Sequence, residues 1–124
     1  MNSDFTIPRD RYYTIDGTAK DADDVVIDIS DPAKITFKMV SLRDASKTLT
    51  KTTAVATEID KLVDASGTYR IFIQAADTKT LPAGYYRYEV AYQDDPATTV
   101  EAYTLNPTSD EYGILLLDEE VVVL

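Results

Sequence analysis

The chain has 124 residues, of which 44% are hydrophobic and 27% charged, and these values suit one globular domain and not a disordered chain. Its 22 acidic residues outnumber its 12 basic ones, and the formal net charge of −10 argues against binding to nucleic-acid phosphates or to anionic membrane surfaces. The sequence contains no cysteine and no histidine, which excludes disulfides, thiolate metal sites and the most common general base.

From the sequence we expect neither a signal peptide nor a membrane-spanning segment. The first residues lack the apolar segment of a signal peptide, and the longest apolar runs, residues 114–117 and 121–124, are far too short to span a bilayer. We therefore expect a protein that is made in the cytoplasm and kept out of the membrane.

Short extended segments alternate with turn formers along the whole chain. The predicted strands cover residues 5–7 with 12–15, 25–29, 35–42, 48–56, 68–75, 85–92, 100–105, 114–117 and 121–124. The predicted breaks between them are at Pro8, Asp16-Gly17, residues 18–24, Asp31-Pro32, residues 43–47, Gly67, Asp94-Asp95-Pro96, residues 106–113 and residues 118–120. Residues 48–56 lack a clean apolar face, so we expect them at the edge of a sheet.

One segment fits two structures. Residues 57–65 place Ile59, Leu62 and Val63 at helical spacing, and Thr57 with Asp60 resembles a short capping box. The segment is nevertheless too short to form a stable helix by itself.

The clearest local signals lie in residues 76–92. Asp77 is placed to cap a single helical turn by accepting a hydrogen bond from an unpaired backbone N–H. Leu81 would anchor that turn in the core, and Pro82 would end it because proline has no N–H. Gly84 then gives the backbone freedom that a sharp reversal requires.

A strand with strict alternation follows this corner. Tyr86, Tyr88, Val90 and Tyr92 fall on one face, and residues 85, 87, 89 and 91 fall on the other. With about seven to nine short strands and turn signals every 8–12 residues or so, the sequence predicts an all-β sandwich or barrel. Alternation with one polar face favours antiparallel pairing.

Catalysis has little support in the sequence. A hydrolase with paired carboxylates is conceivable, but nothing marks out a pair, and the acidic residues gather in predicted turns. We expect no catalytic residues and no cofactor.

Two acidic loops are the candidates for a cation site. They consist of Asp21, Asp23 and Asp24 near Asp28 and Asp31, and of Asp118, Glu119 and Glu120. The calcium-loop spacing of an EF-hand fails, because Val25 stands where a ligand belongs and the glycine of the turn is missing. Solvated loop charges are the favoured interpretation, so no metal ligand is predicted.

The nine tyrosines allow a second binding hypothesis, because aromatic faces can stack on sugars. Tyr86, Tyr88 and Tyr92 share a face with Val90, which favours the core. The tyrosines expected to be more exposed are Tyr12, Tyr13, Tyr85, Tyr103 and Tyr112.

The last four residues suggest an interface. Val121, Val122, Val123 and Leu124 would make a strand that is apolar on both faces, and such a strand needs a second layer from this chain or from a neighbour. We favour a neighbour, which implies oligomerisation or docking into a larger assembly.

The order of these features resembles a small Ig-like β-sandwich module of tailed-bacteriophage virion proteins, in particular the N-terminal domain of the phage baseplate upper protein family. The resemblance rests on four stretches: FTIPRDRYYTI, DISDPAKITFKMV, GTYRIFIQAADTKTLPAGYYRYEVAY and LDEEVVVL. The corner and the tyrosine-rich strand are the most specific of these. The sequence departs from the pattern in its long 106–113 loop and in Asp118-Glu119-Glu120, which stands where a turn with glycine is usual.

The resemblance implies a single Ig-like sandwich over residues 1–124 and a structural or accessory role in a virion, on the tail, the baseplate or the capsid. It implies contacts with other virion proteins and several copies in a symmetric assembly. The alternative is a carbohydrate-binding module that recognises a cell-surface glycan, which Tyr85 and Tyr112 would serve.

Overall fold

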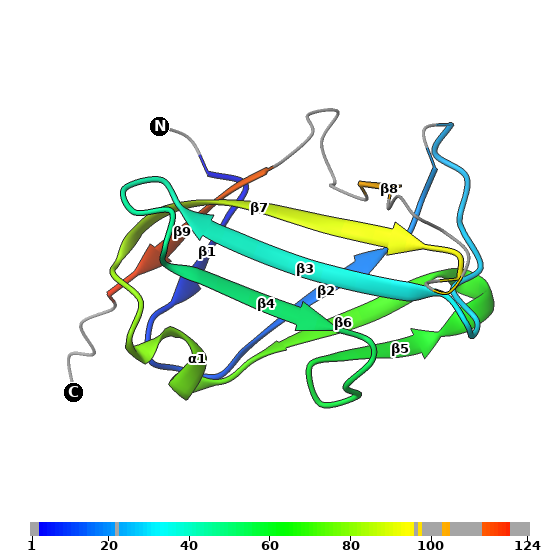
Figure 1. The fold of residues 1–124 in the computed structure, drawn as a ribbon, viewed down its shortest axis with the longest axis horizontal. Coiled ribbons are helices and arrows are strands. Elements are labelled where there is room, and N and C mark those ends of the chain that lie inside the picture. Colours follow the sequence, from blue (N-terminus) through cyan, green and yellow to red (C-terminus); the bar gives the residue numbers. More distant parts are fainter. Residues whose placement is uncertain (1–2, 22, 96, 98–102, 105–112, 120–124) are drawn as a thin grey trace.

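A computed structural model gives the fold shown in Figure 1, and it describes residues 3–21, 23–95, 97, 103–104 and 113–119. The strands are β1 (Phe5–Pro8), β2 (Tyr13–Thr18), β3 (Lys34–Ser41), β4 (Thr48–Thr52), β5 (Ile59–Val63), β6 (Thr68–Ile73), β7 (Gly84–Gln93), β8 (Tyr103–Thr104) and β9 (Gly113–Asp118). Two short helices interrupt them, the 3₁₀ helix η1 (Asp64–Ser66) and α1 (Ala75–Lys79). No helix in the described part of the chain has the length and apolar character needed to cross a membrane.

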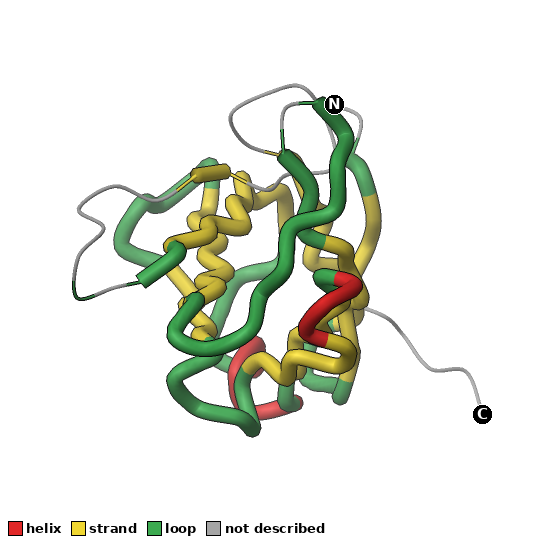
Figure 2. Tube along the Cα trace, turned by 90° about the vertical axis from the view of Figure 1, so that its right-hand side faces the viewer, coloured by secondary structure: helices red, strands yellow, loops and turns green. Residues whose placement is uncertain are grey.

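The strands form two sheets that pack face to face. One sheet has six strands in the order β1-β9-β7-β3-β4, with β8 paired to β7, and the other has three in the order β2-β6-β5. This is the strand order of an immunoglobulin-type sandwich. The smaller sheet corresponds to strands B, E and D (β2, β6 and β5), and the larger sheet contains the equivalents of strands G, F, C and C′ (β9, β7, β3 and β4). The predicted all-β, Ig-like sandwich is confirmed. Figure 2 looks at it from the end where residues 19–33 and η1 lie.

The N-terminal segment passes from one sheet to the other. The pattern around Pro8 predicted one broken strand, but the structure has two strands in different sheets: β1 pairs with β9 in the larger sheet, and β2 pairs with β6 in the smaller one. The β1–β9 pair is parallel, whereas the remaining strand pairs of the described chain are antiparallel.

The core lies between the two inner faces, where alternate residues point. On β3 the side chains of Ile35, Phe37 and Met39 are fully buried, as the alternation predicted. The other strands contribute Ile7, Ile59, Tyr69, Ile71, Ile73, Tyr86, Tyr88, Val90, Tyr92, Leu115 and Leu117. Burying each large apolar side chain contributes about 1.5–3 kcal/mol, so the pattern of alternation specifies which face of each strand turns inward.

The predicted strand at residues 25–29 is wrong. Only Val26 makes a bridge, with Lys20, and Val25 and Val26 are exposed while Ile29 is buried. The Asp21 carboxylate accepts the backbone N–H groups of Asp23 and Val25. Aspartate side chains that bind nearby backbone groups compete with a strand ladder, and here Asp21 stabilises a turn just before the segment, which has no regular structure apart from that bridge.

The turn predicted at Asp16-Gly17 is also wrong, because β2 continues through both residues. Gly17 lies opposite Tyr69 on β6, and a Cβ atom at position 17 would come within 2.4 Å of the Tyr69 ring. The glycine therefore serves close packing of an aromatic ring on a strand, not a reversal.

The ambiguous segment 57–65 divides between two structures. Ile59–Val63 is the strand β5, and Asp64–Ser66 is the 3₁₀ helix that ends at Gly67, whose φ is +67°. The strand predicted at residues 48–56 ends earlier, at Thr52, and lies at the edge of the larger sheet as expected.

Candidate functional site

The predicted corner forms between β6 and β7, and its centre is the short helix α1. Asp77 accepts the backbone N–H of Gln74 across 2.7 Å, so it caps the turn from inside the helix, with Gln74 at the capping position. The same carboxylate forms an ion pair with Lys51 of β4, with Nζ and Oδ2 2.6 Å apart. Only 7% of the Lys51 side chain is exposed, so α1 is tied to the edge of the larger sheet by a nearly buried contact.

The corner then closes as the sequence predicted. Leu81 is buried, and Gly84 begins β7 with a φ of +138°, a conformation that side chains rarely allow. The hydroxyl of Tyr86 donates to the carbonyl oxygen of Pro82 across 2.6 Å. A tyrosine near the start of this strand that bonds back to the preceding loop is the tyrosine corner of immunoglobulin-type sandwiches.

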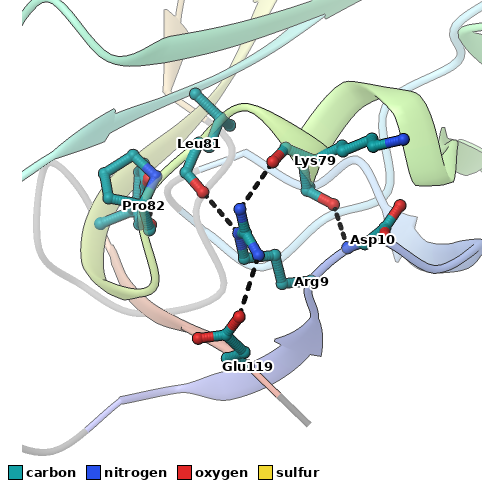
Figure 3. A network of polar contacts seen from close by, with 8 residues as sticks. Arg9, Asp10, Lys79, Leu81, Pro82 and Glu119 are labelled. Carbon is teal, nitrogen blue, oxygen red and sulfur yellow. Dashed lines mark hydrogen bonds and ion pairs between the residues drawn. The ribbon is translucent and has the colours of Figure 1, made fainter.

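Arg9 joins three segments that are distant in the sequence (Figure 3). Its Nε donates to the carbonyl of Leu81 across 2.7 Å, and its Nη2 donates to the carbonyl of Lys79 across 2.6 Å. Its Nη1 forms an ion pair with Glu119, just after β9, at 3.1 Å. The planar guanidinium thus binds the carbonyl of the last residue of α1 and a carbonyl of the turn that follows the helix.

A second contact reinforces this one. The backbone N–H of Asp10 donates to the hydroxyl of Thr78, a fully buried residue of α1, across 2.8 Å. The β1–β2 turn, α1 and the end of β9 are therefore fastened together at one end of the sandwich.

Two buried tyrosines have strongly perturbed hydroxyl groups. Burial raises the pKa of Tyr69 to about 12. Burial also raises the pKa of Tyr88, and the Asp4 carboxylate that accepts its hydroxyl across 2.8 Å raises it further. Both hydroxyls stay protonated at neutral pH, so they act as hydrogen-bond donors or packing groups and not as bases.

The carboxylates of Asp28 and Asp31 already have partners within the chain. Asp28 accepts the hydroxyl and the N–H of Ser30, which hold the pKa of its carboxyl below the ordinary value. Asp31 pairs with Lys61 at 2.8 Å, and this bond lowers the pKa of Asp31. Within the described residues, no three acidic side chains gather closely enough to hold a metal ion.

The outer face of the six-stranded sheet presents a mixed surface. Lys38 and Val40 of β3 lie beside Glu89 and Arg87 of β7, and the four side chains line a shallow depression of about 130 Å³. Pockets that enclose a small molecule are usually about 300–1,000 Å³. The depression therefore suits a contact surface better than a ligand cavity.

The tyrosines considered for sugar binding do not gather into one platform in the described structure. Tyr12 is 57% exposed on the side of the smaller sheet, whereas Tyr13 and Tyr85 are half-buried on different sheets. The side chain of Tyr103 and the whole of Tyr112 lie outside the described residues. The interface residues Val121, Val122, Val123 and Leu124 also lie outside them, so their role stays a prediction.

Sequence reasoning missed the three polar residues that hold the corner, Arg9, Lys51 and Thr78. Each acts on a partner distant in the chain, and only Lys51 gave a local signal, as a lysine placed among alternating threonines at a predicted edge. Comparison of the chain with protein-family models and with curated proteins found no match. The function must therefore be argued from the fold and its surfaces.

Proposed function

We propose that this chain is a non-enzymatic structural or accessory protein of a bacteriophage virion that acts through contacts with other proteins. The proposal takes its biological setting from the resemblance carried by residues 5–15, 28–40, 67–92 and 117–124. Its mode of action is argued from the described surfaces.

The main support for a role in protein–protein contacts is that the polar side chains at the corner bind groups within the chain. Arg9, Lys51, Asp77 and Tyr86 bind backbone groups or one another and connect the N-terminal strand, α1 and the end of β9. This arrangement braces a scaffold and leaves sheet faces and edges as the surfaces for partners. In a particle with symmetric assemblies, the same surface of each copy would meet a neighbour repeatedly.

The apolar residues at positions 121–124 would supply one of these contacts, since a strand with two apolar faces is stable only when both faces are covered. Other virion proteins or further copies of this chain would cover them. The protein would accordingly be found in the particle, on the tail, the baseplate or the capsid.

Quantitative peptide mass spectrometry of particles purified on a density gradient tests the proposal. We expect this chain in the particle fraction at a fixed copy number relative to the major structural proteins. Its absence from the particles, or a copy number that varies with washing, would overturn the proposal. The carbohydrate-binding alternative predicts binding on a glycan array that Tyr85→Ala or Tyr112→Ala abolishes.

A further inference from the structure

In the described part of the chain four strands end the two sheets, and the two-residue β8, paired only with β7, adds a fifth edge that is too short to pair with a further strand. β1 and β4 end the larger sheet, and β2 and β5 end the smaller one. An edge strand presents unpaired backbone groups to which a strand of another chain can add, and proteins that stay monomeric usually carry a residue that prevents this.

Two of the edges carry an inward-pointing lysine. Lys51 of β4 lies opposite Phe37 on the inner face and pairs with Asp77. Lys61 of β5 lies opposite the buried Tyr69 and pairs with Asp31, and the pairing of β5 shifts between Lys61 and Val63. An inward charge and an irregular register both oppose the addition of a further strand.

A third edge, β1, has only four residues and ends at Pro8, which cannot donate a ladder hydrogen bond. β2 lacks the protective features of the other edge strands. It has six residues, Tyr13–Thr18, without proline or lysine, and its register with β6 is unbroken. Among the edges that the structure describes, β2 is thus the one without such a protective feature.

The backbone of β2 is oriented for pairing. The N–H of Ala19 donates to the carbonyl of Gly67, which continues the β2–β6 ladder by one residue. Since hydrogen-bonding direction alternates along an antiparallel strand, residues 13, 15 and 17 bond to β6. The N–H and C=O groups of Thr14, Asp16 and Thr18 then point toward the open edge.

We propose that β2 pairs antiparallel with β2 of a second copy, joining the two smaller sheets into one six-stranded sheet. This inference rests on the proposed role in assembly and names one contact of it. A two-fold contact uses the same edge on both subunits, so the edge has to complement itself.

The sequence of β2 meets this condition in the register centred on Ile15. With Ile15 opposite the partner's Ile15, each Thr14 faces the partner's Asp16 and each Tyr13 faces the partner's Gly17. Apolar residues then meet on the inner face, and a hydroxyl meets a carboxylate on the outer face.

The neighbouring register is less favourable. It would place Asp16 directly opposite the partner's Asp16, and like charges in that position are destabilising. Within each subunit Asp16 has a bidentate partner, Arg70, with Nε–Oδ1 and Nη2–Oδ2 distances of 2.7 and 3.1 Å. This partner is present in either register, so the preference for the first register comes from the Thr14–Asp16 pairs that replace a direct Asp16–Asp16 contact.

One pair of six-residue edges buries less than the roughly 1,200 Å² of a stable independent interface. We therefore expect a weak dimer in solution that becomes firm when other contacts hold the copies together in an assembly.

The experiment compares two proline variants by sedimentation velocity at increasing protein concentration, up to about 1 mM. Thr14→Pro removes an N–H that points to the open edge of β2. Thr50→Pro is the matched control, because Thr50 points to the open edge of β4, as the bonds from Ser41 to Lys47 and from Thr53 to Ile35 show. We expect the wild type and Thr50→Pro to form dimers and Thr14→Pro to stay monomeric.

Amide hydrogen exchange of the wild type provides a readout that needs no variant. Exchange at Thr14 and Asp16 should slow several-fold as the concentration rises, while exchange at Thr50 should not change. A wild type that stays monomeric throughout, a Thr14→Pro variant that dimerises like the wild type, or exchange at Thr14 that is independent of concentration would overturn the inference. These readouts use purified protein, so their outcome is separate from the presence of the chain in particles.

Discussion

Replacing Tyr86 with phenylalanine tests the hydrogen bond that closes the corner. The Tyr86 side chain is fully buried, and its hydroxyl donates to the Pro82 carbonyl across 2.6 Å. The substitution keeps the ring in the core and removes only the donor. The carbonyl of Pro82, which is half-buried, then loses its partner without gaining full access to water.

Leaving a buried acceptor without its donor costs about 1–3 kcal/mol. For a chain of this length each kcal/mol lowers the melting temperature by roughly 4 °C, so Tyr86→Phe should lower it by about 4–12 °C. The matched control is Tyr85→Phe on the same strand, whose half-buried ring lies on the outer face. It should change the free energy of unfolding by less than about 0.5 kcal/mol.

Urea unfolding followed by far-ultraviolet circular dichroism measures both variants, and calorimetry gives their melting temperatures. If Tyr86→Phe and Tyr85→Phe lower the free energy of unfolding equally, the reasoning is refuted, because the hydrogen bond to Pro82 would then contribute no more than a surface hydroxyl. Equal slopes of the two urea transitions are needed for the comparison.

Three further predictions concern other parts of the account. Lys51→Met should lower the free energy of unfolding by about 2–3 kcal/mol, because it leaves the Asp77 carboxylate, which is 23% exposed, without its cation. Adding Asp77→Asn should recover part of that loss, as a double-mutant cycle measured by urea unfolding would show. Burial raises the pKa of Tyr69 from 10.0 to about 12, so the protonated Tyr69 hydroxyl contributes its full stability below pH 10 and loses it as the pH rises through 12. The free energy of unfolding should therefore fall over that range, and the fall should be smaller in Tyr69→Phe. Replacing residues 121–124 with serine should weaken association with partner proteins, measured by co-sedimentation, more than it lowers the melting temperature; equal effects would contradict the interface hypothesis.

Local patterns were sufficient for the corner and for the strands beside it. Pro82 restricts the backbone at its own position, Gly84 permits the positive φ that the reversal needs, and the alternation of Tyr86, Tyr88 and Val90 indicates which face is buried. Neither signal depends on a distant residue. This is why the sequence predicted the turn, the direction of β7 and the burial of its inner face correctly.

The failures occurred where a distant residue decides the structure. Gly17 resembles a turn glycine until the Tyr69 ring, 52 residues further on, is seen packed against its backbone. In residues 25–29 the apolar alternation was real, but the Asp21 and Asp28 side chains bind backbone groups near the two ends of the segment, and it forms only the single bridge at Val26.

The polar side chains of the candidate site were the hardest to foresee. A lysine in an edge strand is usually exposed, yet Lys51 turns inward because Asp77 on α1 lies within reach of its ammonium group. Arg9 likewise binds carbonyl groups of residues 79 and 81, a relation that no local pattern contains. Recognising such residues needs the sheet order, which only the three-dimensional structure provides.

The most direct test of the proposed function is immunogold labelling of particles from the source with an antibody to this chain. The account predicts gold at defined positions, either on the tail tip or distributed over the head, in repeated and symmetric numbers. Label that is absent from both intact and disrupted particles would contradict the virion role and would favour a free binding module instead.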